Sequence, residues 1–287
     1  MNIVTLRHGD VDLHLAPAAG GGIAAFRWQG IDVMRPASAA ALANLDPLGL
    51  SSFPLVPWSN RIARGRFTWN GREVRLPLNF GNHPHVIHGH GWQARWAVKA
   101  QGEGDATLSF DHKAGDWPWS YRAEQRFELT HDGFDLRLSV ENRSDTPMPA
   151  GLGHHPYYLK TPGMRLHAHL EGWWETDAFI MPTGYREERR DDWSDKLQAP
   201  TTTDNVFAGW DGTARIEWPE RGIALSMTAG EAARWMVIYS PPDQDIACIE
   251  GVTHPTDPFN DPKHPGLAVV EPGAAFALDT RFRVSAL

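Results

Sequence analysis

Residues 124–140 read EQRFELTHDGFDLRLSV and contain two short runs in which apolar and polar side chains alternate. The apolar residues of the second run are Phe134, Leu136, Leu138 and Val140. A period of two is typical of a strand that buries one face. His131-Asp132-Gly133 separates the runs and has the composition of a turn, so this stretch predicts a β-hairpin.

Similar patterns recur along the chain. Residues 67–69 and 73–76 flank Asn70-Gly71, residues 215–218 and 223–227 flank a Pro-Glu-Arg-Gly turn, and residues 276–284 alternate again. No segment sustains the apolar spacing of an amphipathic helix. Residues 37–45 could form a short helix or a turn, and residues 177–204 are predicted to form a long functional loop or a surface excursion. The chain is therefore expected to be all-β, a large antiparallel β-sandwich.

Composition and charge exclude several classes of protein. The 287 residues show no repeat or compositional shift, which predicts one domain over residues 1–287. A net charge of −8 argues against nucleic acid or an anionic membrane as the main partner. Cys248 is the only cysteine, so no intrachain disulfide can form. Without a signal-peptide pattern or an apolar run of about 18 residues, a cytoplasmic location is expected. The sequence leaves the oligomeric state open.

Two segments are candidates for ligand binding. Residues 60–67, NRIARGRF, carry three arginines, whose guanidinium groups suit carboxylates or sugar hydroxyls, although a solvated basic turn has the same composition. Residues 82–92, NHPHVIHGHGW, carry four histidines. His88-Gly89-His90 resembles the first ligands of a cupin metal site, but residues 91–98 contain no carboxylate. Hydrogen bonding to a hydroxylated ligand is the other functional interpretation.

Two further segments offer an acid and a base. In residues 151–159, GLGHHPYYL, small residues and a proline hold His155 rigidly, either for proton transfer or as a packed turn residue. In residues 267–273, LAVVEPG, Glu271 follows an apolar run. Partial desolvation there would favour a base, and a surface strand end is the alternative. Residues 249–260 are interpreted as a shaped loop at a pocket mouth, and Asp204 precedes a strand.

Taken together, these segments resemble the aldose 1-epimerase (galactose mutarotase) family. The matching pieces are, in order, NRIARGRF, HVIHGHGW, GHHPYYL, TDNVF, VTHPTDPFN and VVEPG, spread from residue 60 to residue 271. The resemblance implies the galactose mutarotase-like supersandwich, with an open cleft on one sheet. It also implies a carbohydrate-metabolising isomerase that acts on a small sugar and needs no metal or cofactor. The chain departs from the usual galactose mutarotase pattern at His90 and Leu159.

The resemblance also implies roles for individual residues. His155 matches the general acid, Glu271 the general base, and His88 a second histidine that hydrogen-bonds the sugar near its ring oxygen. Other candidates for sugar contact, by resemblance or by their place in the same motifs, are Arg61, Asp204, Asn60, Trp92 and Tyr157. The base would take the proton of the C1 hydroxyl while the acid protonates the ring oxygen, and the open-chain aldehyde would rotate and reclose.

Two alternatives stay open at this point. A hexose-6-phosphate 1-epimerase-like enzyme would use Arg61, Arg64 and Arg66 to hold a phosphate. A non-catalytic sugar-binding protein on the same fold would have no need of an acid–base pair.

Overall fold

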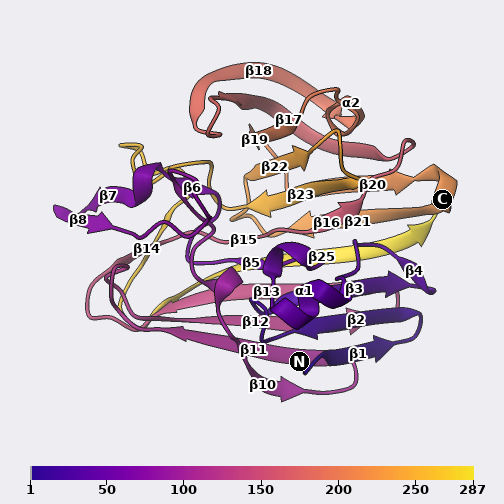
Figure 1. Ribbon diagram of the computed structural model, residues 1–287, viewed down its shortest axis with the longest axis horizontal. Coiled ribbons are helices and arrows are strands. Elements are labelled where there is room, and N and C mark those ends of the chain that lie inside the picture. The colour runs from indigo at the N-terminus through magenta and orange to yellow at the C-terminus, as the bar shows by residue number, and fades with distance from the viewer. Residues whose placement is uncertain (1) are drawn as a thin grey trace.

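A fifteen-stranded antiparallel sheet forms the body of the computed structural model, which describes residues 2–287 (Figure 1). Its strand order is β10-β11-β12-β13-β25-β21-β20-β17-β19-β22-β23-β15-β5, with β16 paired to β23 and β18 to β17. The strands are β5 (Pro54–Leu55), β10 (Ala97–Gln101), β11 (Asp105–His112), β12 (Tyr121–Thr130), β13 (Gly133–Asn142), β15 (Gly153–His154), β16 (Tyr157–Leu159), β17 (Arg165–Thr176), β18 (Pro182–Asp192), β19 (Thr203–Ala208), β20 (Thr213–Trp218), β21 (Ile223–Ala229), β22 (Trp235–Ser240), β23 (Ile246–Val252) and β25 (Ala275–Ala286).

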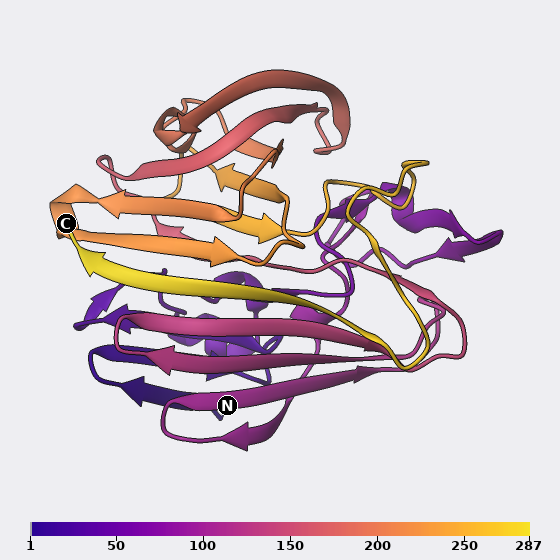
Figure 2. The same cartoon turned by 180° about the vertical axis from the view of Figure 1, so that it is seen from behind.

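A second, four-stranded sheet packs against part of the first. It consists of β1 (Val4–His8), β2 (Val11–Ala16), β3 (Gly22–Trp28) and β4 (Ile31–Asp32). These indigo strands lie in front of the magenta strands β11–β13 in Figure 1 and behind them in Figure 2. The predicted all-β sandwich is therefore confirmed.

The remaining elements are short. Three two-stranded ladders pair β6 (Arg61–Ile62) with β9 (Val86–Ile87), β7 (Arg66–Trp69) with β8 (Arg72–Arg75), and β14 (Met148–Ala150) with β24 (Ala268–Val270). The helices are α1 (Ala39–Asn44), α2 (Ser194–Leu197) and the 3₁₀ turns η1 (Pro47–Gly49), η2 (Ala63–Gly65), η3 (Gly91–Gln93) and η4 (Pro219–Arg221). Within residues 2–287 none of these helices has the length and apolar character needed to cross a membrane.

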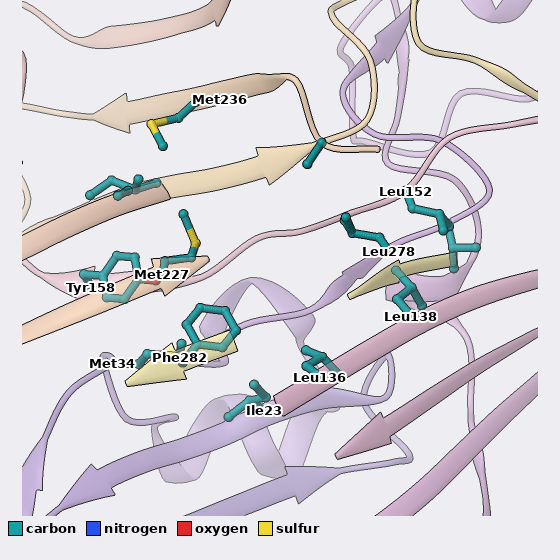
Figure 3. Close-up of a cluster of buried hydrophobic side chains, with 14 of the residues drawn as sticks. Ile23, Met34, Leu136, Leu138, Leu152, Tyr158, Met227, Met236, Leu278 and Phe282 are labelled. Carbon is teal, nitrogen blue, oxygen red and sulfur yellow. The ribbon is translucent and has the colours of Figure 1, made fainter. Parts of the chain in front are cut away.

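The core between the two layers follows from the alternation in the sequence. Figure 3 shows Ile23 of β3 beside Leu136 of β13, with Leu278 and Phe282 of β25 next to them. All four side chains are at most 3% exposed. Burial of apolar surface of this kind is the main favourable contribution to folding.

The predicted hairpins are confirmed. β12 and β13 pair over their full length, with Leu129 opposite Phe134 and Phe127 opposite Leu136. β7 pairs with β8 across Asn70-Gly71, and β20 pairs with β21 across η4. The short helix allowed in residues 37–45 forms as α1, which Ser38 caps by accepting a hydrogen bond from the backbone of Ala41.

For residues 177–204 the long loop is wrong, whereas a surface excursion fits this mostly exposed segment. β18 and α2 occupy most of it, and β18 forms a long hairpin with β17. The side chains of β18 are mostly exposed and charged, so the strand has no alternating pattern to reveal it. Its backbone hydrogen bonds to β17 hold it in place, and its charges suit the edge of a sheet.

Strand alternation also creates a second, smaller apolar layer on the opposite face of the large sheet. On β22, Met236 and Ile238 belong to the main core, whereas Val237 belongs to the second cluster and Tyr239 packs against it. On β23, Ala247 and Ile249 face the main core, and the intervening residues face the second cluster. The candidate functional site lies on this second face.

Candidate functional site

A cavity of about 350 Å³ opens on the second face of the large sheet. Its size falls within the range of small-ligand sites, which is roughly 300–1,000 Å³. Figure 1 shows that the elements supplying it, β6, β16, β19, β22 and β23, gather above the N-terminal sheet. The lining residues are Arg35, Leu48, Asn60, Arg61, Phe80, Ile87, His88, Trp92, His155, Tyr157, Asp204, Val237, Tyr239, Gln244, Ile246 and Glu250.

Two adjacent strands, β22 and β23, carry the floor of the cavity. On β23, alternation places Ile246, Cys248 and Glu250 on the cavity side. Because residues directly opposite each other in an antiparallel ladder share a face, Tyr239 beside Cys248 and Val237 beside Glu250 extend the same surface. The floor is therefore apolar, with a carboxyl group set into it.

His88 follows β9 in a strained backbone conformation. Its φ is +64°, which is uncommon for a residue other than glycine, and such strain tends to occur at functional sites. The backbone N–H of Asn60 donates to Nδ1 of His88 at 3.2 Å. Burial lowers the pKa of His88 well below its usual value, and His155 and Arg61 lower it further. The neutral ring must then carry its proton on Nε2, which leaves an N–H donor for a ligand.

His155 lies between β15 and β16 against the floor. Its ring stacks on Tyr157 with centroids 4.7 Å apart and packs against Phe53 at 4.6 Å. Its Nε2 atom is 3.3 Å from Oε1 of Glu250. Burial lowers the pKa of His155 to about 3. The imidazole is therefore neutral near pH 7.

Glu250 is 2% exposed and is the carboxyl group closest to His155. Burial raises its pKa well above the usual value; nearby Asp204 adds to this, and Arg61 opposes it. The opposite pKa shifts favour a neutral imidazole beside a neutral carboxyl, 3.3 Å apart, so that the two groups share one transferable proton.

Asp204 and Arg61 form the second charged pair of the cavity. Nη2 of Arg61 lies 3.5 Å from Oδ2 of Asp204, and both side chains are largely buried. Burial raises the pKa of Asp204, and Arg61 works in the opposite direction. Asn60 orients the arginine, because its Oδ1 accepts hydrogen bonds from the backbone N–H and from Nη1 of Arg61.

The structure does not bring Glu271 to the cavity. Glu271 lies in the exposed turn after β24 and is not among the lining residues. The apolar run before it is not a buried strand: β24 is three residues long and pairs only with β14, and Val269 is 55% exposed. The expectation that Glu271 faces His155 is therefore wrong, and Glu250 occupies that place.

Most, but not all, of the other candidate residues predicted from the sequence line the cavity. Seven of them line the cavity: Asn60, Arg61, His88, Trp92, His155, Tyr157 and Asp204. Arg64 and Arg66 do not: they line a separate depression near β8.

Glu250, Arg35 and Tyr239 are lining residues that the motifs missed. The interpretation of residues 249–260 as a loop was wrong at its start, because β23 extends to Val252. The run IACIEGV does carry a signal, since a Glu inside an apolar strand is rarely buried without a partner. Arg35 has no neighbouring motif that could have identified it.

Metal binding has one geometric candidate among residues 2–287. Donor atoms of His155, Cys248 and Glu250 lie within 4.8 Å of one another. However, burial raises the pKa of the Cys248 thiol well above its usual value, which disfavours the thiolate ligand. Nδ1 of His155 also lacks the hydrogen-bond partner that orients most metal-bound histidines. These residues fit proton transfer better than metal binding.

The His88-Gly89-His90 run does not form a cupin-like site. His88 faces the cavity, whereas His90 stacks on His112 with centroids 4.3 Å apart and lies 3.0 Å from the hydroxyl of Tyr121. The two imidazole rings therefore have different neighbours and do not face a common site.

A β-sandwich with a polar cavity on one sheet face is the arrangement that the motifs implied. The chain belongs to the aldose 1-epimerase family, whose sequence profile matches residues 2–283. YphB, an uncharacterised protein of Escherichia coli K12, is 32% identical over 294 residues that cover 99% of both chains. A galactose mutarotase of Rattus norvegicus is 30% identical over 105 residues, which cover 35% of this chain and 29% of that protein.

A solved structure supports the same relationship. A protein of Escherichia coli K12 that is provisionally named an aldose 1-epimerase superposes with a TM-score of 0.91 at 31% identity. The superposition covers 100% of this chain and 99% of the other.

The close approach of Gly89 to the segment before it yields a test of how His88 is held. A Cβ on Gly89 would lie 2.1 Å from the carbonyl oxygen of Val56, and its φ is +71°. Gly89→Ala should therefore lower the free energy of unfolding by several kcal/mol, well beyond the roughly 1 kcal/mol that strain at a positive φ alone costs. Urea denaturation measures the difference.

Gly71→Ala is the matched control, because Gly71 has a φ of +79° and open space around its Cβ position. Equal losses in the two variants would contradict the account of steric contact at Gly89.

Proposed function

We propose that the protein is a mutarotase, an aldose 1-epimerase that interconverts the α and β anomers of an aldose by opening and reclosing the ring. The observation that carries the proposal is the His155–Glu250 pair in a sugar-sized cavity. Mutarotation requires one group to accept a proton from the C1 hydroxyl and another to donate one to the ring oxygen. Membership of the aldose 1-epimerase family supports the same reaction.

The pKa shifts of the two groups support a division of roles. The raised pKa of Glu250 makes it the acid, and the lowered pKa of His155 makes it the base. Glu250 protonates the ring oxygen, and His155 removes the proton of the C1 hydroxyl as the C1–O5 bond breaks and the carbonyl forms. The pair then consists of imidazolium and carboxylate, and its total charge is unchanged.

Reclosure uses the same two groups in reverse. After rotation about C1–C2, the carboxylate takes the proton of the O5 hydroxyl as that oxygen attacks C1. The imidazolium returns its proton to the new C1 hydroxyl. These roles are the opposite of those that the sequence motifs implied, and the base is no longer Glu271.

The remaining lining residues would bind the sugar. The Nε2–H of His88 can donate a hydrogen bond to a sugar oxygen near the reacting carbon, and its ring centroid is 5.3 Å from that of His155. Arg61 and Asp204 offer a donor and an acceptor to hydroxyl groups. Trp92 supplies a flat surface for a C–H face of the ring. The ring of Tyr157 is already covered by His155 and by Arg35, so it supports these two groups.

The first test measures the turnover of Glu250→Gln and Glu271→Gln by polarimetry on freshly dissolved α-D-glucose and α-D-galactose. Glu250→Gln keeps the shape of the side chain but cannot exchange the proton, so turnover should fall about 10²–10⁴-fold. His155→Ala should lose activity to a similar extent.

Glu271→Gln is the control and should keep wild-type turnover, because Glu271 lies outside the cavity. Full activity in Glu250→Gln with loss in Glu271→Gln would restore the base that the motifs implied. Absence of turnover in the wild type, with sugar binding retained, would favour a non-catalytic sugar-binding protein.

The pH dependence of turnover provides a second test. The active pair holds one proton, so activity is lost below the lowered pKa of His155 and above the raised pKa of Glu250. Turnover number should therefore stay level from about pH 5.5 to 7.5, across the ordinary imidazole pKa of about 6.5. A tenfold fall per pH unit above about 6.5 would instead indicate an imidazolium acid of ordinary pKa.

A further inference from the structure

The cavity contains two guanidinium groups, and only one is paired with a carboxylate. Arg61 has Asp204 at 3.5 Å. Arg35 has no carboxylate oxygen within 4.0 Å of its nitrogens in the part of the chain that the structure describes, residues 2–287. Arg35 is therefore the guanidinium group of the cavity that no carboxylate faces, and burial disfavours charge on the neighbouring His155 and Glu250.

Arg35 is held rigidly. Its Nη2 donates to the carbonyl oxygens of Leu48 at 2.7 Å and Leu50 at 2.6 Å. Its guanidinium group lies over the ring of Tyr157, 4.1 Å from the centroid. Its backbone N–H also donates to the carbonyl oxygen of Tyr157 at 2.8 Å. Nε and Nη1 make no hydrogen bond to any of the described residues, so these donors are free for a ligand.

Arg35 marks the open side of the cavity. Its carbonyl partner Leu48 is 39% exposed and the lining residue Gln244 is exposed, whereas Glu250 on the floor is 2% exposed. A sugar whose C1 meets the His155–Glu250 pair would therefore direct a more distant substituent towards Arg35. The guanidinium fork suits a group with two or more acceptor oxygens.

We propose that Arg35 binds an anionic substituent of the sugar, so that the substrate is an aldose carrying a phosphate or a carboxylate remote from C1. This inference rests on the proposed function for its orientation of the sugar. It differs from the phosphate site suggested by the sequence, because Arg64 and Arg66 lie in a separate depression.

The overall charge of the protein makes the local cation significant. The chain carries a net charge of −8, which disfavours an anionic ligand in the absence of a specific partner. A neutral aldose would leave the free donors of Arg35 to water. A bidentate anion would use them, and charge-assisted hydrogen bonds are about twice as strong as neutral ones.

Equilibrium binding tests the proposal directly. Calorimetric titration of the wild type and of Glu250→Gln would use D-glucose, D-glucuronate and D-glucose 6-phosphate. At least one anionic sugar should bind about 10- to 100-fold more tightly than glucose. Whether glucuronate or the phosphate ester gains more identifies the anionic group.

Arg35→Met should reduce that preference to near unity while keeping the length of the side chain. Arg64→Met is the matched control, since it removes an arginine of the neighbouring motif from outside the cavity, and the preference should survive. Denaturation curves check that both variants fold. If Arg35→Met fails to fold, Arg35→Lys, which keeps the charge but loses the planar fork, should show a reduced preference for the anionic sugar.

The proposal is overturned if glucose binds as tightly as both anionic sugars, if neither anionic sugar binds, or if the preference persists without Arg35. The proposed reaction and the proposed anion site have different contradicting outcomes. Binding of an anionic sugar through Arg35 without turnover would refute mutarotation and support the anion site. Turnover with a preference for glucose would support mutarotation and refute the anion site.

Discussion

The proposed chemistry depends on one buried carboxyl group. Glu250 lies inside an otherwise apolar strand and is 2% exposed. An ionised carboxylate at such a place would be costly without a partner, so burial favours the protonated form of Glu250, 3.3 Å from the imidazole of His155. Burial moves the pKa values of the two groups in opposite directions, which separates an acid from a base near neutral pH. A solvent-exposed pair could not achieve this.

The sandwich fold provides the buried position of Glu250. The main core packs one face of β22 and β23, and the alternating residues of the same strands form the cavity floor. Short loops carry the groups above the floor. His88 lies in a strained turn after β9, and Asn60 forms hydrogen bonds with both His88 and Arg61. The rigid sheet thus sets the positions of the proton-transfer pair, and the loops set the contacts to the sugar.

The sequence predicted the fold class well because alternation is a local signal, as in residues 124–140 and 276–284. It predicted seven of the cavity residues, since these stand in compact motifs rich in His, Arg and Gly. It failed at β18, where exposed charges leave no period, and at Glu271, where an apolar run of four residues suggested a buried strand that does not exist. Glu250 carries a signal in its apolar run that the motifs did not use, but its partner His155 is revealed only by the fold. Arg35 comes to the cavity through tertiary contacts, which a single sequence does not display.

The measurement that most directly tests the central claim is isotope-edited infrared spectroscopy of the Glu carboxyl groups at neutral pH. We predict a carbonyl band of a protonated carboxylic acid that is present in the wild type and in Glu271→Gln and absent in Glu250→Gln. Such a band would place the proton of the pair on Glu250. A spectrum with only ionised carboxylates would contradict the account, because Glu250 could not then act as the acid that opens the sugar ring.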